Sequence, residues 1–391
     1  MSVVAIPEEY VALTDALRDF VEREARPLEE QHAQELQETG HITGAVEMRR
    51  ALRKKSVAAG FYGLFMPEEV GGAGIGYLGM ALAYEAVAQT GSYLAAGGGL
   101  LPNVEGPTPV LLDCNEEQRE RYLMPTMRAE REAAFALTEP EAGSDATKIK
   151  TRAVATGSGG YVVNGRKHFI THGAEADYVL LFAVTDPEKG AQGGITCFLV
   201  DTDTPGFTVA RKQQTMYDNH QAELVFEDME VGAEQILGRE GYGFYSAMKW
   251  INGGRIQIAA NAVGVAQHLL GKMLDYAKTR EAFGKPIGKN QYVQGHIVDS
   301  LCELEQARLL TYVASDTIDN GGDGRTWAAK AKYVASEMVG RVADRAIQVY
   351  GGNGYMTEMG IERYARMVRA MRLYEGTSEI LKTNIAKGLG L

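Results

Sequence analysis

Glu375 stands near the end of the chain in the segment RLYEGTSEI, residues 372–380, directly before a glycine and two hydroxyl residues. A carboxylate in this setting can be a surface charge at the start of a helix, where acidic side chains are favourable. It can also act as a general base, if a pocket removes its water and raises its pKa. These residues alone leave both interpretations open.

Three further segments carry glycines, hydroxyls or cations that could hold phosphate groups. ALTEPEAGSDATKIKT, residues 136–151, offers backbone N–H groups and hydroxyls, although an ordinary inter-domain turn has the same composition. KTREAFGKPIGKNQYVQGHIVD, residues 278–299, places Arg280 near an aromatic ring, as an exposed helix end or an anion site would. QVYGGNGYMTEMGIERYAR, residues 348–366, puts glycines between helices, where a helix cap and a close approach of phosphate are the alternatives.

Residues 74–79, GIGYLG, satisfy the dinucleotide-binding pattern G-x-G-x-x-G. That motif requires a strand–helix–strand unit with an acidic residue about 20 positions further on. No Asp or Glu lies between Glu85 and Glu105. We therefore interpret this segment as a loop rather than a nucleotide site.

The composition excludes several classes of protein. The chain has 391 residues, a formal net charge of −11 and a pI near 5.3, which opposes a nucleic-acid-binding surface. Its three cysteines, Cys114, Cys197 and Cys302, suggest neither disulfides nor a metal cluster and fit a reducing compartment. The N-terminus lacks a signal-peptide pattern, and no apolar run is long enough to span a membrane. We expect a soluble protein without a metal site.

The elements that position these segments follow in the order helical, β, helical. Residues 8–24 and later segments of the first third show helical periodicity. From about residue 136 short β-rich runs alternate with glycine or Asn-Gly turns, and after about residue 241 the helical pattern returns. The sequence therefore predicts three domains, at residues 1–135, 136–240 and 241–391, with a sheet packed between or against two helical units.

Taken in this order, the segments closely resemble the acyl-CoA dehydrogenase family of FAD enzymes over almost the whole chain. ALTEPEAGSD is similar to the first family signature, and QVYGGNGYMTE…RYARMVRAMRLYEGTSEI is similar to the second. GRKHFITHGAEADYVLL, GITCFLVDTDTPGF and REAFGKPIGKNQ follow between them in the family's order. The resemblance implies an α+β fold with an N-terminal helical domain, a central β-barrel or sandwich domain and a C-terminal four-helix bundle. It also implies a homotetramer, a dimer of dimers.

The resemblance further implies a reaction. Members of the family oxidise an acyl-CoA thioester to the trans-2-enoyl-CoA: a carboxylate takes the α-proton, flavin N5 accepts the β-hydride, and an electron-transfer flavoprotein normally reoxidises the flavin. We therefore expect FAD, an acyl-CoA substrate and an electron-transfer flavoprotein partner. We also expect a role in fatty acid β-oxidation, in the cytoplasm or, in a eukaryote, the mitochondrial matrix. Alternatives on the same scaffold are a desulfinase, an enoyl-CoA reductase or an oxidase, and a non-catalytic flavoprotein scaffold is an alternative of another class.

By this resemblance Glu375 matches the catalytic base, and its backbone N–H would help to hold the thioester oxygen. Some relatives carry the base immediately before an arginine in the segment that corresponds to NGGRIQIAA, and that position is Gly254 here. The family pattern therefore supplies no other base. The predicted substrate contacts are Ser144, Arg255, Tyr374 and Gly376, with Arg255 resembling an arginine that contacts the CoA portion.

Residues that resemble the family's flavin contacts fall into two groups. Those of the central domain are predicted to lie along the ring system and near the pyrophosphate: Phe135, Leu137, Thr138, Gly143, Ser144, Phe169 and Thr171. Those of the C-terminal domain are predicted to hold the adenosine and phosphates, partly from a neighbouring subunit: Arg280, Phe283, Gln291, Gln348, Gly351, Gly352, Thr377 and Glu379. Sites shared in this way would make FAD binding depend on assembly.

Three positions depart from the family pattern: Phe169 replaces a frequent Trp, His172 a frequent Asn, and Asn252 a frequent Asp. His172 could titrate at the flavin edge or be a structural histidine. The acyl pocket is predicted to border residues 97–109 and Tyr374. The segments NGGR and NQYVQ favour a short or branched acyl group, and the sequence does not define the substrate further.

Overall fold

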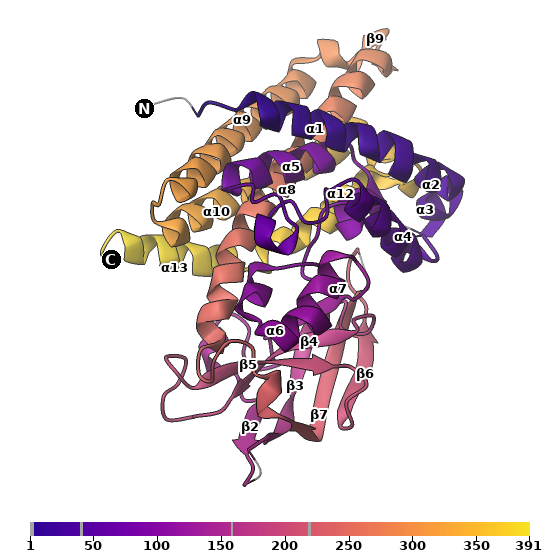
Figure 1. Ribbon diagram of the computed structural model, residues 1–391. Helices are drawn as coiled ribbons and strands as arrows, with labels where there is room; N and C mark the ends of the chain where they lie inside the picture. Colours follow the sequence, from indigo (N-terminus) through magenta and orange to yellow (C-terminus); the bar gives the residue numbers. More distant parts are fainter. Residues whose placement is uncertain (1–3, 40–41, 158, 218–219) are drawn as a thin grey trace. The chain divides into compact units, whose positions relative to one another are not determined.

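The structure is a computed structural model that describes residues 4–39, 42–157, 159–217 and 220–391. The described residues form two compact units. The helical unit lies within Met1–Leu52, Ile75–Leu101 and Asn252–Leu391, and the sheet unit lies within Arg53–Gly74 and Pro102–Ile251. Helices from both ends of the chain thus share one unit, as the indigo and yellow ribbons of Figure 1 show.

The helical unit is built around α9 and α10, which pack along each other. The helices that begin in its segments Met1–Leu52 and Ile75–Leu101 are α1 (Glu8–Phe20), α2 (Arg26–Gln31), α3 (Ala33–Thr39), α4 (Ala45–Ala58) and α5 (Tyr77–Gln89). The helices of the last third are α8 (Gly243–Thr279), α9 (Gln291–Asp319), α10 (Gly324–Tyr350), α11 (Gly352–Tyr355), α12 (Ile361–Arg369) and α13 (Ser378–Gly388). A small hairpin of β8 (Glu281–Ala282) and β9 (Lys285–Pro286) joins α8 to α9. Helix α10 also packs against α12 and α13, and α5 packs against α1 and α9.

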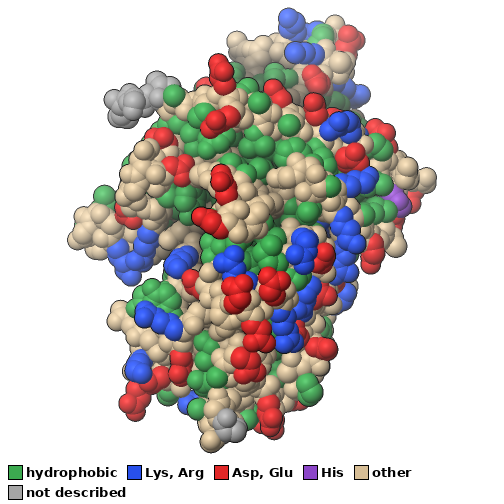
Figure 2. All heavy atoms as spheres, in the orientation of Figure 1, with side chains coloured by type: hydrophobic (Ala, Val, Ile, Leu, Met, Phe, Trp, Pro, Cys, Tyr) green, Lys and Arg blue, Asp and Glu red, His purple; other side chains and the backbone are tan. Residues whose placement is uncertain are grey.

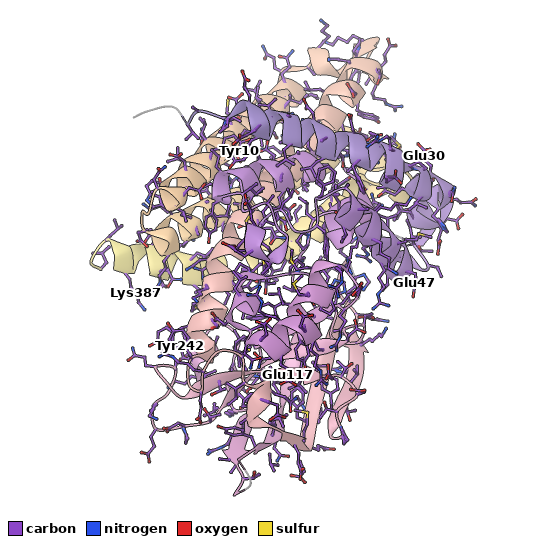
Figure 3. The ribbon with its side chains drawn as sticks, in the orientation of Figure 1. Tyr10, Glu30, Glu47, Glu117, Tyr242 and Lys387 are labelled. Carbon is purple, nitrogen blue, oxygen red and sulfur yellow. The ribbon has the colours of Figure 1, made fainter. Side chains whose placement is uncertain are left out.

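Close approaches fix α5 against its neighbours. The Asp319 carboxylate at the end of α9 accepts hydrogen bonds from the Tyr77 and Leu78 N–H groups at 2.7 and 2.9 Å, which caps the first turn of α5. On α5 itself, a Cβ at Gly79 would stand 3.0 Å from the ring of Tyr10, which is labelled on α1 in Figure 3. A glycine at this position lets the two helices pack closely.

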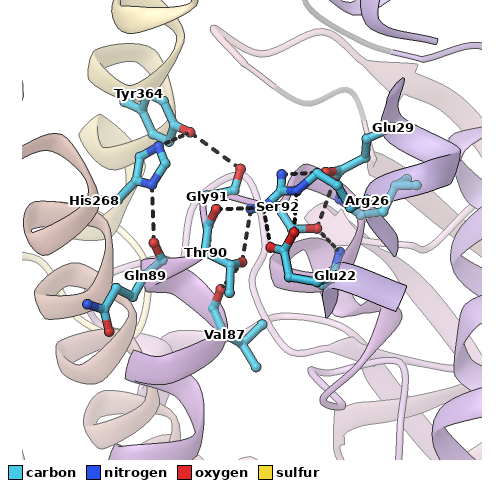
Figure 4. Close-up of polar contacts among 12 residues, drawn as sticks. Glu22, Arg26, Glu29, Val87, Gln89, Thr90, Gly91, Ser92, His268 and Tyr364 are labelled. Carbon is cyan, nitrogen blue, oxygen red and sulfur yellow. Dashed lines mark hydrogen bonds and ion pairs between the residues drawn. The ribbon is translucent and has the colours of Figure 1, made fainter. Parts of the chain in front are cut away.

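The segment 89–94 after α5 is held by buried polar groups, shown in Figure 4. The buried carboxylate of Glu29 accepts a hydrogen bond from the Ser92 hydroxyl at 2.8 Å. On the other side, the Tyr364 hydroxyl lies 3.0 Å from Nε2 of His268. Burial lowers the pKa of His268 to about 4. This imidazole is therefore neutral near pH 7 and serves as a structural link.

The sheet unit contains one curled seven-stranded sheet. Its strands are β1 (Ala133–Ala136), β2 (Arg152–Ala155), β3 (Tyr161–Thr171), β4 (Tyr178–Val184), β5 (Ile195–Asp201), β6 (Phe207–Gln213) and β7 (Gln221–Val231). The order is β1-β4-β2-β3-β7-β6, and β5 also pairs with β4. Strand β4 is parallel to β1 and β2, whereas the other pairs are antiparallel. The short helices α6 (Glu116–Gln118) and α7 (Met124–Met127) precede the sheet.

Strand β4 is buried on both faces. Its sequence YVLLFAV is a continuous apolar run, as expected for a strand that has no solvent-facing side. Tyr178, Leu180 and Phe182 join one hydrophobic cluster, and Val179 and Leu181 join another. Two cores, one on each face, therefore fix the part of the sheet from which the candidate site residues extend.

The fold class predicted from the sequence is confirmed, because helical parts precede and follow a β part. Short helical turns connect the larger elements: η1 (Val21–Ala25), η2 (Glu68–Val70), η3 (Ala95–Gly99), η4 (Pro109–Asp113), η5 (Arg119–Leu123), η6 (Ala146–Lys148), η7 (Ala233–Gln235), η8 (Ile287–Lys289), η9 (Thr357–Met359) and η10 (Ala370–Arg372). Among the described residues no helix is long and apolar enough to cross a bilayer. The three predicted domain boundaries stay a prediction.

Candidate active site

The Glu375 turn, defined as residues 374–377, connects η10 to α13. Thr377 caps α13, since its hydroxyl accepts a hydrogen bond from the Ile380 N–H at 3.3 Å. Glu375 and Gly376 have φ angles of 54° and 93°. This left-handed region is ordinary for glycine and strained for glutamate. The surrounding structure must therefore hold Glu375 in place.

The carboxyl group of Glu375 is arranged as a base would be. Its Oε2 is buried and has no hydrogen-bond partner among the described residues. Burial raises the pKa of Glu375 to about 7, although the nearby positive charges of Arg255 and Lys332 oppose this shift. Within the described chain, the N–H groups of Glu375 and Gly376 have no acceptor either. The turn thus presents a weakly acidic carboxyl beside two open hydrogen-bond donors, rather than a hydrated surface charge.

Gly254 of α8 faces this carboxyl group. A Cβ at Gly254 would lie 3.4 Å from Cδ of Glu375 and 3.6 Å from its Oε2, which are ordinary contact distances. The position where some relatives carry their base therefore lies next to the carboxyl group that this chain carries on another element.

Two buried cations bind the backbone of the Glu375 turn. Arg255 donates from Nε to the Glu375 carbonyl at 3.1 Å, and Lys332 donates from Nζ to the Gly376 carbonyl at 2.7 Å. Arg255 also donates to Oδ1 of Asn252 at 3.2 Å. The sequence analysis predicted a functional role for Arg255 but none for Lys332. The available signal was a lysine among the alanines of a helical stripe, AAKAKYVA, at residues 328–335.

The other predicted substrate residues occupy different settings. Tyr374 is 46% exposed, and Gly376 lies against Arg255, whose Nη2 would be 3.4 Å from a Cβ added there. Arg255 is buried and committed to the turn, and its predicted contact with the CoA portion stays a prediction. Ser144 is exposed in the sheet unit.

In the sheet unit a β-bulge turns Phe169 outward. Lys167 pairs with Leu224 and Ile170 with Ala222, so β3 has one residue more than β7 in this interval. Phe169 takes up the extra length with a φ of 58° and is 61% exposed, whereas Lys167, two residues before it, and Ile170, directly after it, are buried. Bulges of this kind re-aim side chains and are common beside active sites. An exposed ring on a strained strand residue therefore marks a candidate binding surface.

Lys167 ties the predicted flavin segments together. Its fully buried Nζ donates to the Leu137 carbonyl at 3.0 Å and to Oε1 of Glu139 at 2.8 Å. Burial lowers the pKa of Lys167 to about 8, against the opposing charge of Glu139. Burial alone would raise the pKa of Glu139, but the ammonium group and several hydrogen bonds outweigh it and lower that pKa. The pair fixes residues 137–139 beside β3.

The predicted flavin-ring contacts of the sheet unit lie at or near the C-terminal ends of β1 and β3. The Thr138 carbonyl accepts a hydrogen bond from the His168 N–H at 2.8 Å, and Phe135 packs on Phe182 at 4.7 Å between ring centroids. Thr171 ends β3 and is partly buried. Gly143 and Ser144 lie in the exposed segment after β1, and a Cβ at Gly143 would meet no atom within 4 Å.

His172 lies in a polar cluster of the sheet unit. Its Nε2 is 3.8 Å from the buried Oε2 of Glu105, its ring stacks on His220 at 5.0 Å, and its N–H donates to the His220 carbonyl at 2.7 Å. His172, Glu175 and His220 also bring potential metal ligands within 4.8 Å of one another. Lys212 occupies Oε1 of Glu175 at 2.6 Å. These contacts give His172 a structural setting, and a role at the flavin edge stays a prediction.

Six residues of the second group of predicted flavin contacts lie where the β8–β9 hairpin follows α8 and where α9 begins and α10 ends. Tyr276 near the end of α8 stacks on Tyr350 at the end of α10, with ring centroids 4.0 Å apart. This contact brings the hairpin residues Arg280 and Phe283, and then Gln291 at the start of α9, toward the helix end that carries Gln348, Gly351 and Gly352. All six are exposed. Glu379 is exposed in the first turn of α13, beside the cap Thr377. The end labelled β9 in Figure 1 carries blue Lys and Arg side chains in Figure 2.

The predicted flavin segments share exposed rings and left-handed backbone. Phe283 is 98% exposed at the hairpin tip, with a φ of 55°. Four of the six described non-glycine residues with positive φ belong to the candidate segments: Phe169, His172, Phe283 and Glu375. A Cβ at Gly351 or Gly352 would meet no atom within 4 Å, so the backbone there is open to approach. An exposed ring and an open glycine backbone are features that a flavin dinucleotide would cover.

Comparison with known proteins identifies the family. Family models for the N-terminal, middle and C-terminal domains of acyl-CoA dehydrogenase match residues 7–130, 134–229 and 241–390. The chain is 38% identical to an acyl-CoA dehydrogenase of Bacillus subtilis over 98% of both chains. It is 38% identical to the human mitochondrial short-chain specific acyl-CoA dehydrogenase, over 98% of this chain and 90% of the relative. It is 36% identical to CarC of the caffeyl-CoA reductase-Etf complex of Acetobacterium woodii, over 93% of both.

Solved structures agree. Butyryl-CoA dehydrogenase from Megasphaera elsdenii is 34% identical with a TM-score of 0.86, and the FAD complex of PigA is 30% identical with a TM-score of 0.87. Each comparison covers 99% of both chains. The fold and the matches define the class: this chain belongs to the acyl-CoA dehydrogenase family. It is therefore an oxidoreductase of that family, and the predictions of family and enzyme class are confirmed.

Proposed function

We propose that the protein catalyses the FAD-dependent α,β-dehydrogenation of an acyl-CoA thioester, with Glu375 as the general base. The buried carboxyl oxygen of Glu375 without a protein partner is the observation that carries this proposal. A group with a pKa near 7 is suited to take a proton from carbon near neutral pH.

FAD is the cofactor of this class, as the FAD complex of a related structure illustrates. The residues that would hold it are the group around Phe169 in the sheet unit and, contributed by a neighbouring subunit, the group around the β8–β9 hairpin. When bound, FAD supplies the acceptor for the hydride from the β-carbon of the substrate.

The chain's own residues would carry the proton and the developing negative charge. Glu375 takes the α-proton onto its carboxyl group. The Glu375 N–H, which has no acceptor within the described chain, donates to the thioester oxygen and stabilises the charge that gathers there. Tyr374, half-exposed beside the base, would border the acyl chain.

Three names among the relatives bear on substrate, direction and partner. The short-chain and butyryl-CoA dehydrogenases favour a short acyl group for this chain. The caffeyl-CoA reductase-Etf complex supports an electron-transfer flavoprotein as partner, and it keeps enoyl-CoA reduction as the second candidate function. A role in β-oxidation, the tetramer and a cytoplasmic or matrix location remain part of this proposal.

The substrate class is tested by mixing the purified flavoprotein, without oxygen, with straight, branched and aryl acyl-CoAs. We expect loss of flavin absorbance, fastest with a short acyl chain. The reverse arm starts with the reduced enzyme and adds enoyl-CoA and arylacrylyl-CoA. A flavin that no acyl-CoA reduces, while an enoyl-CoA reoxidises it rapidly, would replace dehydrogenation by reduction as the function.

The rate of flavin reduction should depend on pH with a midpoint near 7. Glu375 must be ionised to act, and its pKa is about 7, so kcat/KM should fall about tenfold per unit below that pH. Between pH 7 and pH 5 the loss is about 50-fold, because half of the Glu375 carboxyl groups are already protonated at pH 7. The measurement is single-turnover flavin reduction at several pH values, with FAD content checked at each. A profile that stays flat down to pH 5 would assign the proton transfer to another group.

A further inference from the structure

We infer that Lys332, acting with Arg255, is a positioning residue that holds the Glu375 turn in its left-handed conformation by binding two consecutive carbonyl oxygens. Its importance for catalysis rests on the proposed function of Glu375, but its importance for the turn does not.

Among the described residues, the hydrogen bond to the Gly376 carbonyl is the contact that explains the burial of Lys332. Its side chain is 0% exposed on α10, among small neighbours such as Ala328 and Ala335. Within the described chain it forms no ion pair, and its hydrogen bond goes to the Gly376 carbonyl at 2.7 Å. Removing an ammonium group from water is costly unless it is well bonded. A lysine retained in such a place therefore points to a specific task at the carbonyl that it binds.

The two cations act on one strained element from two helices. Arg255 on α8 binds the carbonyl of Glu375, and Lys332 on α10 binds the carbonyl of the next residue, Gly376. Bonds from charged donors are stronger than neutral ones, so both can offset the strain of a non-glycine residue with a φ of 54°. Fixing both carbonyls fixes the dihedral angles from which the Glu375 side chain projects.

The two bonds from Arg255 and Lys332 to the carbonyls of the Glu375 turn, here called the clamp, also orient the Gly376 N–H. The C=O and N–H of one peptide unit point in opposite directions because the unit is planar and trans. Binding of the Glu375 carbonyl by Arg255 therefore turns the Gly376 N–H toward the opposite side, where it has no acceptor among the described residues. Arg255 therefore lies on one side of this peptide unit, and the Gly376 N–H points to the other side.

The charge of Lys332 acts on the carboxyl group as well. It opposes the effect of burial on the pKa of Glu375, as Arg255 does. The groups that face Lys332 are Glu375 itself, Arg255 from α8, Glu337 from α10 and Glu379 from α13. Loss of the ammonium group should therefore raise the pKa of Glu375 and require a higher pH for ionisation.

The test compares Lys332→Met, which removes charge and donor at similar volume, with Lys332→Arg, which keeps both. Lys330→Met is the matched control, because it removes a lysine two residues earlier on the same helix, where the ammonium lies over Trp327. Two readouts are taken on the flavoprotein: amide hydrogen exchange of peptides covering residues 373–381, and the pH midpoint of flavin reduction by an acyl-CoA.

We expect Lys332→Met to speed exchange in residues 373–381 at least about tenfold, without a similar change in α9. We also expect the midpoint to rise by about one pH unit. Lys332→Arg should lie between Lys332→Met and the wild type.

If Lys332→Met behaves like Lys330→Met in both readouts, the inference is wrong and Lys332 only fills space. Should Lys332→Met not fold, Lys332→Gln, which keeps a donor without charge, must show the faster exchange or the inference fails. If no acyl-CoA reduces the wild-type flavin, the proposed function fails. The hydrogen-exchange measurement still tests whether Lys332 holds the Glu375 turn.

Discussion

Glu375→Gln should slow flavin reduction by an acyl-CoA by about 1,000-fold or more, because an amide of the same shape cannot take the α-proton. FAD content should stay as in the wild type. Rapid mixing without oxygen, followed by the flavin absorbance, gives the rate. If the variant reduces its flavin at a rate within tenfold of the wild type, Glu375 is not the base.

The same variant has a stability signature that needs no substrate. The pKa of Glu375 is raised by folding from 4.5 to about 7, so its contribution to stability is lost as pH rises from about 4.5 to about 7. Glu375→Gln removes this loss. It should be more stable than the wild type above pH 7 by about 3 kcal/mol, and equal to it below pH 4.5. Denaturation at both pH values checks the sign.

Moving the carboxylate to another element gives a gain-of-function control for the prediction that Glu375 is the base. A side chain at Gly254 would start 3.4 Å from Cδ of Glu375, so a glutamate there can reach the same region. The double variant Glu375→Gly, Gly254→Glu should reduce its flavin at least about tenfold faster than Glu375→Gly alone. Absence of any recovery would show that the Glu375 turn contributes more than its carboxylate.

Lys167→Met should destabilise the protein by about 3 to 5 kcal/mol, because it leaves the buried carboxylate of Glu139 without its cation. It also removes the bond to the Leu137 carbonyl, so FAD should be held less tightly. The urea midpoint and the FAD content of the purified protein measure the two effects. The matched control is Lys212→Met, which removes an exposed partner of Glu175 and should cost less than about 1 kcal/mol.

A second substitution separates charge from packing at this pair. Glu139→Gln in the Lys167→Met background leaves no unpaired charge, so the double variant should regain part of the lost stability. If the double variant is less stable than Lys167→Met alone, the hydrogen bonds of Glu139 to the 150–151 backbone matter more than its pairing with Lys167.

The sequence was sufficient for the class and order of the elements. Apolar periodicity separated helical from β segments, and one of the predicted β runs is β4, which the structure shows to be buried on both faces. The family segments predicted Glu375 as the base and Gly254 at the position where some relatives carry theirs, and in the structure a Cβ at Gly254 would lie 3.4 Å from Cδ of Glu375. The proposed roles of the site residues still await experiment.

Two kinds of feature could not be predicted from the sequence. Lys167 and Lys332 are buried because of partners distant in the chain, whereas a lysine in a helical or strand pattern is ordinarily exposed. The outward turn of Phe169 depends on a one-residue mismatch between β3 and β7, and a mismatch is a property of the pair of strands. The left-handed backbone of Glu375 likewise depends on the cations behind it.

The exposed rings have a practical consequence for anyone producing the protein. Phe283 is almost fully exposed, Tyr292 at the start of α9 is 92% exposed, and Phe169 is 61% exposed. Bare aromatic surface promotes association between unfinished molecules. We expect expression to yield more precipitate when the cell makes the chain faster than it makes flavin, and riboflavin in the growth medium to improve recovery. The supply of a vitamin would then limit how much soluble enzyme a cell accumulates.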